Sequence, residues 1–500
     1  MPALGKYLLL LCLTVAIGSI PLRAQDAKAS LDAVSAALGA ANVRTIEFSG
    51  RGFDGTFGQP YDANAPWPRF AVPAMTVTID YATPALRDDR RRQQWENPPL
   101  GGGFQPISGE MRQTWFLSGN YAWDVAGTAA TPAAPERDFR SAVDGRLTQV
   151  WATPQGFIKA AIANNATVRA ETIRGAKKTI ITFTAPNKMK FEGTVGEQNL
   201  VERIETWYGS PVLGDTKFEA IFGAYKDFAG MKFPTHIVQR NGPYPILDLD
   251  VIDVKPNVTV SIDVPANIRN APAPSTAPLQ AERISDGLWM VQGTVKSVAI
   301  EMRDHLIVVE APETEARSIA VIDALKRAIP NKPIRYLINT HHHFDHSGGL
   351  RTYVAEGATI ITHQGNIAFF ENVWRNPRTI SPDRLARSPR AAVFEGITGT
   401  RLMSDGSREV NIYHYAGNMH NPGLLMVHLP RERTLIEADS WSPPATAGDY
   451  PGAIANLVQF YQSVERLNLD VEQVVPIHGR LTTWDEIRQS VQTYGKTQTN

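Results

Sequence analysis

Residues 335–349 read RYLINTHHHFDHSGG, a short apolar strand followed by four histidines and one aspartate within six residues. Histidine and carboxylate side chains are the ligands that suit zinc. Side chains alternate along an extended segment, so His341 and His343 point the same way and can hold one metal ion. Asp345 and His346 follow at a turn, which the Ser-Gly-Gly sequence after them permits, and can reach a second ion. The other explanation for these six residues alone is a histidine-rich surface turn that binds metal only by accident.

Three further residues of the same ligand types stand at strand ends or tight turns downstream. His420 lies in GNMHNPG, residues 417–423, directly before a mostly apolar run. Asp439 follows the apolar strand TLIEA, and His478 follows the strand VVPI and precedes a glycine. Loops at such positions on an α/β scaffold gather functional sites. Accidental metal binding is therefore a poor explanation of the whole set.

The order and spacing of these residues resemble the metallo-β-lactamase superfamily. The shared features are His-x-His-x-Asp-His, a later His before x-Pro-Gly, an Asp that closes a strand and a last His before Gly. The resemblance covers roughly residues 279–500 and implies an αββα sandwich, in which two mixed sheets pack together with helices outside. It also implies two Zn²⁺ ions with these ligands: His341, His343 and His420 for the first, Asp345, His346 and His478 for the second, and Asp439 as the bridge between them.

The bridging position indicates the branch within this superfamily. True β-lactamases of this fold typically carry Cys or Ser there, whereas Asp439 resembles the glyoxalase-II-like and lactonase-like hydrolases. The resemblance therefore implies a zinc-dependent hydrolase in which a metal-bridging hydroxide attacks an ester, thioester, lactone or amide. Asp345 is expected chiefly as a ligand, with a proton-shuttling role left open. Asn421 stands where Thr or Ser is common, and an Asn can make the same turn hydrogen bonds.

Two other functions stay open at this point. The first is an oxidoreductase of the same fold with iron in place of zinc, which usually works beside a flavodoxin-like domain; no phosphate-binding glycine loop is evident in the sequence. The second is a module that binds a lipid or another ligand through an N-terminal sheet, with a secondary hydrolase site. Metal analysis distinguishes the first from the hydrolase, and the complete set of metal positions argues against an inactive module.

The amino-terminal residues are typical of a secretory signal peptide. A positive charge at Lys6 precedes an apolar run over residues 7–22, and Leu-Arg-Ala before Gln25 offers a cleavage site. The run is shorter than the about 20 residues that a membrane-spanning helix needs. We therefore expect a signal peptide over residues 1–24 and a periplasmic or secreted protein without a stable membrane span. The only cysteine, Cys12, lies within that segment, so the mature chain is expected to have neither a disulfide nor a thiolate ligand.

Length and composition predict more than one domain and a small-molecule substrate rather than nucleic acid. The chain has 500 residues, and its 50 Lys and Arg balance its 50 Asp and Glu, so no overall charge favours nucleic acid. Residues 270–278, NAPAPSTAP, are rich in Pro and Ala and predict an extended spacer. We place an α+β domain with an antiparallel sheet over residues 25–268, the linker over 269–278 and the hydrolase domain over 279–500. The oligomeric state stays open.

The N-terminal half alternates apolar and polar residues in several strands, as in TVTID over residues 76–80. Helical spacing of apolar residues predicts helices over 30–38 and 147–163, the second interrupted by Gly and Pro. This plan resembles bacterial lipoprotein-carrier domains. Residues 87–92, a run of Arg and Asp, are expected as a solvated turn, and residues 98–103, PPLGGG, as a flexible loop. Neither suggests catalysis, and this half has no cluster of metal ligands.

Two explanations stay open for several residues near the motif. His363 follows a strand and either supports the site from behind or lies solvated. Residues 374–390 hold five arginines and form either a lid for an acidic substrate or, as we prefer, a solvated loop. Trp441 and Tyr450 either line the pocket or pack internally.

Overall fold

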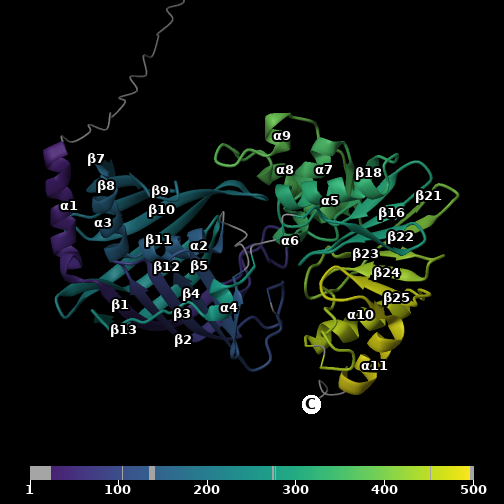
Figure 1. Cartoon of the computed structure of the whole chain (residues 1–500), viewed down its shortest axis with the longest axis horizontal. Helices are drawn as coiled ribbons and strands as arrows, with labels where there is room; N and C mark the ends of the chain where they lie inside the picture. Colours follow the sequence, from purple (N-terminus) through teal and green to yellow (C-terminus); the bar gives the residue numbers. More distant parts are fainter. Residues whose placement is uncertain are drawn as a thin grey trace, which may run out of the picture.

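The computed structural model describes residues 24–103, 105–133, 141–272, 275, 277–450 and 452–495. Except for its last residue, the expected signal peptide lies outside these ranges, as do three residues of the expected linker. Among the described residues, no helix is both long and apolar enough to cross a membrane. The chain forms an N-terminal part built on one large sheet and a C-terminal part of two smaller sheets with helices (Figure 1).

The N-terminal part is built on one antiparallel sheet of thirteen strands. They lie in the order β6-β5-β4-β3-β2-β1-β13-β12-β11-β10-β9-β8-β7, so most strands pair with their neighbours in the chain, whereas β1 also pairs with β13, and β6 and β7 form the two edges. Their bounds are β1 (Thr45–Gly55), β2 (Arg69–Asp80), β3 (Ala85–Gln94), β4 (Glu110–Ser118), β5 (Tyr121–Ala126), β6 (Ala129–Pro132), β7 (Thr167–Ile173), β8 (Ala176–Thr184), β9 (Lys190–Val195), β10 (Val201–Ser210), β11 (Gly214–Phe228), β12 (Met231–Asn241) and β13 (Tyr244–Pro256). This confirms the predicted antiparallel α+β architecture of the N-terminal half.

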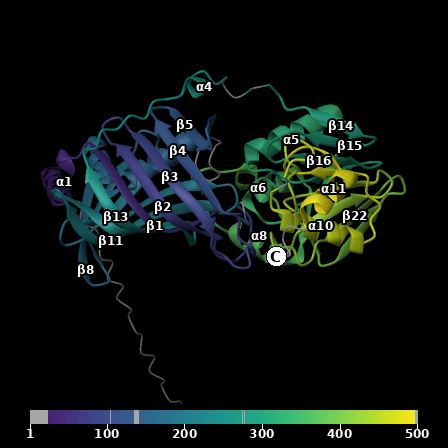
Figure 2. The ribbon, with the colours of Figure 1, turned by 90° about the horizontal axis from the view of Figure 1, so that it is seen from below.

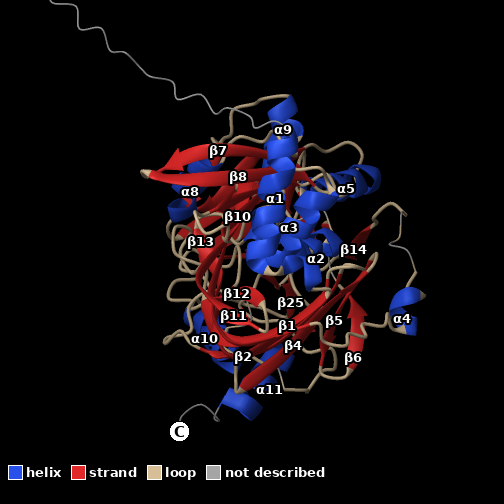
Figure 3. Ribbon diagram, turned by 90° about the vertical axis from the view of Figure 1, so that its left-hand side faces the viewer, coloured by secondary structure: helices blue, strands red, loops and turns tan. Residues whose placement is uncertain are grey.

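Three helices cover one face of this curved sheet: α1 (Ala24–Leu38), α2 (Ala142–Trp151) and α3 (Pro154–Ala163) (Figure 3). A short 3-10 helix, η1 (Ala40–Asn42), follows α1. Alternate residues of β2, among them Val77 and Ile79, point to the covered face and are buried in one apolar core with Leu31 and Leu38 of α1. The alternation in the strands and the helical spacing in α1 thus meet in the same core.

The expected helix over residues 147–163 is wrong in its continuity, because the segment belongs to two helices, α2 and α3. The Thr153 side chain accepts a hydrogen bond from the backbone N–H of Gly156 and caps α3. Pro154 occupies the first turn of α3, where its missing N–H is not needed. A new helix therefore starts at Pro154, where the spacing of apolar residues had predicted a single helix with an interruption.

Residues 87–92 lie in strand β3 and not in the solvated turn that their charges predicted. Arg90 and Arg92 are buried on one face of the sheet, whereas Arg91 between them is exposed. Both buried arginines donate to Asp54 Oδ2, at 3.0 Å and 2.6 Å. Ion pairing lets charges occupy alternate, inward-facing positions of a strand, and an apolar pattern cannot reveal such a strand.

The C-terminal part is the predicted αββα sandwich. A seven-stranded sheet in the order β14-β15-β16-β17-β18-β19-β20 and a six-stranded sheet in the order β21-β22-β23-β24-β25-β26 share one apolar core between them. Both sheets contain parallel and antiparallel pairs. Helices α5, α7 and α8 pack on the first sheet, and helices α10 and α11 pack on the second.

The strands of the two C-terminal sheets are β14 (Ala281–Ser285), β15 (Leu288–Val291), β16 (Ser297–Glu301), β17 (Leu306–Val309), β18 (Ile334–Ile338), β19 (Thr359–His363), β20 (Phe394–Ile397), β21 (Thr400–Ser404), β22 (Glu409–His414), β23 (Leu425–Leu429), β24 (Thr434–Glu437), β25 (Gln473–Pro476) and β26 (Thr482–Thr483). The remaining helices of the chain are α4 (Ala266–Arg269), α5 (Glu315–Ala328), α6 (Phe344–Ser347), α7 (Leu350–Glu356), α8 (Gln364–Val373), α9 (Arg384–Arg387), α10 (Ile454–Arg466) and α11 (Trp484–Tyr494).

Direct contacts hold the two parts together. After β13 the chain passes through α4 and crosses over to β14 (Figure 2). The buried guanidinium of Arg378 donates to the carbonyl of Val212 at 2.8 Å, and Asp215 accepts from the backbone N–H of Thr379 at 2.9 Å. The middle of the arginine-rich stretch 374–390 is therefore a contact with the N-terminal sheet rather than a solvated loop.

Candidate metal centre

The loops that follow β22, β24 and β25, and the segment after β18 with helix α6, which carries Asp345 and His346, bring together the seven residues that the sequence predicted as metal ligands. They form two groups: His341, His343 and His420 with Asp439, and Asp345 and His346 with His478. Within each group, one nitrogen or oxygen atom of each residue lies within 4.8 Å of those of the others. This division is the one that the resemblance implied.

The first group is buried and leaves a nitrogen without a partner. His341 Nε2 lies 3.3 Å from His420 Nε2 and 3.2 Å from Asp439 Oδ2. His343 Nε2 donates to the carbonyl of Pro60 at 2.9 Å, while its Nδ1 has no hydrogen-bond partner among the described residues. A proton on Nε2 leaves the lone pair of Nδ1 for a metal ion, so this group fits one.

Asp439 connects the two groups. Its Oδ2 lies 2.6 Å from His346 Nε2, and its Oδ1 lies 3.3 Å from His478 Nε2. Asp345 completes the second group, because its Oδ2 lies 3.5 Å from His346 Nε2 and 3.6 Å from His478 Nε2. Imidazoles on both sides of a shared carboxylate form a donor set that suits a pair of divalent ions such as zinc.

The electrostatics of the first group favour the protonation states of metal ligands. Burial lowers the pKa of His341 well below its usual value, and the neighbouring His346 acts in the same direction. Burial also lowers the pKa of His343 well below its usual value. Burial opposes the charge of Asp439, but the surrounding histidines outweigh it and hold the pKa of this carboxyl well below its usual range. Neutral imidazoles beside an ionised carboxylate are what a divalent metal requires.

Glu310 holds His346 from the side away from the ligand groups. Glu310 Oε2 lies 3.3 Å from His346 Nδ1, and its Oε1 accepts from the backbone N–H of Thr340 at 3.2 Å. Both Glu310 (φ 77°) and Asp439 (φ 58°) adopt the left-handed backbone conformation that residues other than glycine rarely occupy. Such strain is kept at functional sites where the surrounding structure holds it in place.

Asn421 makes the turn hydrogen bond that the sequence predicted for it. Its Oδ1 accepts from the backbone N–H of Gly423 at 2.9 Å. Its Nδ2 also donates to His342 Nδ1 at 3.0 Å, and His342 Nε2 donates to the carbonyl of Pro60 at 3.1 Å. Both ring nitrogens of His342 are therefore engaged, and this histidine supports the motif without belonging to either ligand group.

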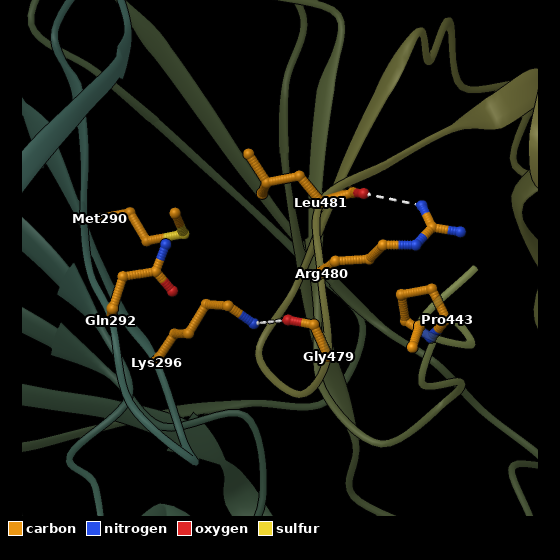
Figure 4. A pocket seen from close by; sticks show the side chains of 8 residues that line it. Met290, Gln292, Lys296, Pro443, Gly479, Arg480 and Leu481 are labelled. Atoms are coloured by element: carbon orange, nitrogen blue, oxygen red, sulfur yellow. Dashed lines mark hydrogen bonds between the residues drawn. The ribbon is translucent and has the colours of Figure 1, made fainter. Parts of the chain in front are cut away.

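A buried lysine fixes the loop that carries His478. Lys296 Nζ donates to the backbone carbonyl of Pro476 at 3.0 Å and to that of Gly479, the second contact being visible in Figure 4. His478 Nδ1 lies 3.0 Å from the carbonyl of Thr294, to which it donates, so its Nε2 is left for the second group. Gly479 adopts φ 81°, a conformation that glycine reaches without strain.

Residues 56–60, between β1 and β2, reach the centre from the N-terminal part. Gln59 Nε2 donates to Asp345 Oδ1 at 2.8 Å. The carbonyl of Pro60 accepts from His343, as described above, and hydrogen bonds of this kind orient ligands and tune their basicity. This segment could not be found from the sequence, because a backbone carbonyl has no signature in a sequence and a single glutamine after a strand is too weak a signal.

Residues 98–103 also contact the centre, so the expectation that this loop is unrelated to the site is wrong. The backbone N–H of Gly101 donates to the carbonyl of Met419 at 2.9 Å. A Cβ atom added to Gly102 would lie 2.9 Å from His343 Cε1 and 3.0 Å from His420 Cε1. The run of three glycines was the available signal, since only residues without a side chain permit so close an approach.

A pocket of about 870 Å³ lies between the ligand groups and the N-terminal sheet, a volume that suits a small molecule. Asp345, Asp439 and His478 line it together with residues of β3 and β4. Trp441 lines the pocket, whereas Tyr450 is 55% exposed and packs against another tyrosine ring. In the part of the chain that the structure describes, no residue of the stretch 374–390 lines this pocket.

His363 does not support the ligand groups from behind. Its Nδ1 accepts from the backbone N–H of Gly365 at 3.3 Å and so caps helix α8. Its ring packs against His414, with the ring centroids 4.4 Å apart. The role of this histidine is structural.

Gly102→Ala is expected to lower metal affinity and any metal-dependent activity by about 10- to 100-fold, the range found when a group that supports metal ligands is lost. The added methyl group would clash with Gln59 Oε1 and would also push against His343 and His420, which cannot move without leaving their ligand positions. Gly223→Ala is the matched control, because it also lies in the N-terminal part but has nothing within 4 Å of its added Cβ. Metal titration of the two variants measures the effect. Equal metal affinities of Gly102→Ala and Gly223→Ala would contradict the close contact between this loop and the two histidines.

Comparison with known proteins finds a family to which the segment with most of the site is similar. Residues 292–446 match the model of the metallo-beta-lactamase superfamily. The 2,4-dinitroanisole O-demethylase subunit alpha of Nocardioides sp. (strain JS1661) is 27% identical over 168 residues, which cover 32% of this chain and 46% of that protein. The acyl-coenzyme A thioesterase MBLAC2 of Homo sapiens is 28% identical over 215 residues, which cover 38% of this chain and 72% of that protein. The chain thus spans about half the length of the first of these relatives.

Solved structures of metallo-beta-lactamases are also similar to this chain. The enzyme from Pontibacter korlensis gives a TM-score of 0.33 at 14% identity and covers 43% of this chain and 97% of its own. FIM-1 from Pseudomonas aeruginosa, in a mono-zinc form, gives a TM-score of 0.33 at 18% identity and covers 45% of this chain and 99% of its own. The segment that matches the family model holds every residue of the two ligand groups except His478. The C-terminal part of this chain is therefore similar to the metallo-beta-lactamase superfamily over residues 292–446.

Proposed function

We propose that this protein is an exported hydrolase that uses two zinc ions to cleave an ester, thioester, lactone or amide bond in a small molecule. The observation that carries the proposal is the pair of ligand groups joined by Asp439 beside a pocket of small-molecule size. A relative named as an acyl-coenzyme A thioesterase supports cleavage of an acyl bond. The signal-peptide pattern of residues 1–24 supports export to the periplasm or the outside of the cell.

The ligand groups fit two zinc ions, which when bound supply a nucleophile at neutral pH and polarise the scissile carbonyl. Asp439 is ionised and faces both groups, so it sets their separation. Gln59 donates to Asp345 Oδ1, which stabilises the ionised carboxylate and leaves Oδ2 toward the second group. We therefore assign Asp345 to holding metal rather than to moving a proton.

The chain's own residues also control access to the centre. Gly102 lies against His343 and His420 of the first group, Gln59 donates to Asp345 of the second, and both line the pocket. Trp441 and His478 lie along the pocket that opens beside Asp439. A substrate that enters this pocket meets both ligand groups at once, and the surrounding walls limit the water around the scissile bond.

Metal analysis of the purified mature protein, together with a panel of chromogenic esters, thioesters, lactones and a cephalosporin, tests this function. We expect about two zinc ions per chain and hydrolysis of an acyl ester or thioester in preference to the cephalosporin. Bound iron without hydrolysis would replace the proposal by the oxidoreductase. A protein that binds no metal after incubation with zinc would contradict the assignment of the ligands themselves.

A further inference from the structure

A cluster of buried charges faces the ligand groups across the pocket. It consists of the buried side chains of Asp54 on β1 and of Asp88, Arg90 and Arg92 on β3, together with the half-buried neutral amide of Gln113 on β4, and we name it the β3 charge cluster. Its members on β3 and β4 line the same pocket as Asp345 and Asp439. Pairing buried charges adds little stability compared with apolar packing, because each charge loses its hydration. Stability alone therefore does not account for the cluster.

The two arginines of this cluster differ in how well they are neutralised. Arg90 donates from Nε and Nη2 to both oxygens of Asp88, at 3.1 Å and 2.5 Å, and from Nη1 to Asp54 at 3.0 Å. Arg92 shares the same Asp54 oxygen through Nε and donates from Nη1 to the neutral amide oxygen of Gln113 at 2.9 Å. Its Nη2 has no hydrogen-bond partner among the described residues. Arg90 thus pairs with both Asp88 and Asp54, whereas Arg92 pairs, within the described part of the chain, only with Asp54, which Arg90 also contacts.

The electrostatic balance agrees with this difference. Burial opposes the charge of Arg90, but Asp88 and Asp54 outweigh it and raise the pKa of Arg90. Burial lowers the pKa of Arg92, and the attraction of Asp54 does not compensate for it while Arg90 adds repulsion. An arriving anion would therefore gain more at Arg92 than at Arg90.

The arginine pair is also held in place by an aromatic ring. Trp115 of β4 lines the pocket, with Arg90 Cζ 4.2 Å and Arg92 Cζ 5.5 Å from its ring centroid. Guanidinium groups that stack on an aromatic face and pair with carboxylates have little freedom left, so little order is lost when a ligand binds.

We propose that Arg92 binds an oxyanion at the end of the substrate remote from the scissile bond, so that the N-terminal part selects small acyl compounds with a terminal carboxylate. The proposal rests on the proposed function of the metal centre. A planar guanidinium matches a carboxylate geometrically, and both ends of the substrate fit one pocket of about 870 Å³. The N-terminal sheet then supplies specificity, and the C-terminal loops supply the chemistry.

A matched pair of substrates tests the proposal in the zinc-loaded, full-length mature protein. The mono-p-nitrophenyl ester of glutaric acid carries a terminal carboxylate, and p-nitrophenyl pentanoate has the same chain length without it. We expect the wild-type kcat/KM to favour the glutarate ester by about 10- to 100-fold, the value of one charge-assisted hydrogen-bonded contact. The preference is expected in KM, because the carboxylate lies away from the reacting bond.

Three variants separate binding from folding. Arg92→Met is expected to bring the ratio of the two kcat/KM values close to one, and Arg92→Lys, which keeps the charge without the planar fork, is expected to restore part of the ratio. Arg91→Met is the control, because Arg91 lies on the same strand with a side chain that is 53% exposed and points away. It is expected to keep the wild-type ratio.

An ester with a terminal phosphate in place of the carboxylate identifies the oxyanion. If the wild type prefers the phosphate ester over the glutarate ester and Arg92→Met loses that preference, the oxyanion is a phosphate instead of a carboxylate.

The outcomes distinguish this proposal from the proposed function. Hydrolysis of both esters without a preference in the wild type, or a preference that Arg92→Met leaves intact, would overturn the role of Arg92 and leave the hydrolase standing. If the protein hydrolyses neither ester, the result counts against the proposed hydrolase. The role of Arg92 is then tested by calorimetric titration of the protein with glutarate. If glutarate binds the wild type and Arg91→Met with the same affinity and binds Arg92→Met about tenfold more weakly, the oxyanion site is supported. Equal affinity for all three proteins overturns it.

Discussion

Asp439→Ala is expected to lower hydrolysis of the best substrate more than about 100-fold and to reduce bound metal from about two ions per chain to one or fewer. Asp439 faces both ligand groups, with oxygens 2.6 Å from His346 Nε2 and 3.2 Å from His341 Nε2. Removing it leaves clustered imidazoles without the carboxylate that offsets two metal charges. Steady-state kinetics and elemental analysis of the same preparation measure both effects.

Two further variants make this result interpretable. Asp439→Asn keeps the size of the side chain and loses the charge, so an intermediate loss of metal is expected. Asp470→Ala removes an exposed carboxylate of the same part that pairs with Arg433, and it is expected to change neither metal content nor rate. An Asp439→Ala protein that retains both metals and its activity would show that another residue joins the two groups.

Removal of metal by a chelator is expected to abolish hydrolysis and to lower the unfolding temperature of the C-terminal part. The ligands are spread from His341 to His478 and gather only in the folded chain, so metal binds the native state and not the unfolded one. An ion present at 1,000 times its Kd then contributes about 4 kcal/mol to stability. Thermal unfolding followed by circular dichroism, before and after chelation and after zinc is added back, measures this shift.

The same treatment of Asp439→Ala provides the comparison. Because that variant starts with less metal, chelation is expected to shift its unfolding temperature less than that of the wild type. If elemental analysis shows that metal has left the wild type and both its activity and its unfolding temperature stay unchanged, the centre is neither catalytic nor stabilising, and the proposed function fails.

The ligand set could be predicted from the sequence because its signals are local. His341, His343, Asp345 and His346 lie within one turn after a strand, and the structure brings them together with His420, Asp439 and His478 in the expected two groups. Asp439 and His478 each follow an apolar strand, and His420 precedes one; strand ends on one side of a sheet meet in space. Residue type, spacing and position near strand ends indicated these candidates, since the metal itself restricts which side chains can serve, and the resemblance to a known family implied how they divide into two groups.

The second wall of the pocket could not be predicted in the same way. Arg90 and Arg92 occupy inward-facing positions of β3, where an apolar pattern would normally be found, and their charges indicated a surface turn. Asp54, which neutralises them, lies on a different strand far away in the sequence. A buried charge is recognisable only beside its partner, and strand pairing decides which partner that is.

By itself, the sequence predicted the antiparallel class of the N-terminal half and the candidate ligand residues, because strand periodicity and metal chemistry act through residue type over short spans. Its resemblance to a known family predicted the sandwich of the C-terminal half. Only the tertiary structure decided that Gln59, Pro60 and Gly102 support the ligands and that β3 faces them. Those contacts join a backbone carbonyl, an amide and a bare Cα to residues hundreds of positions away. Such groups acquire a role from their place in space, since their chemistry alone does not distinguish them from the same groups elsewhere in the chain.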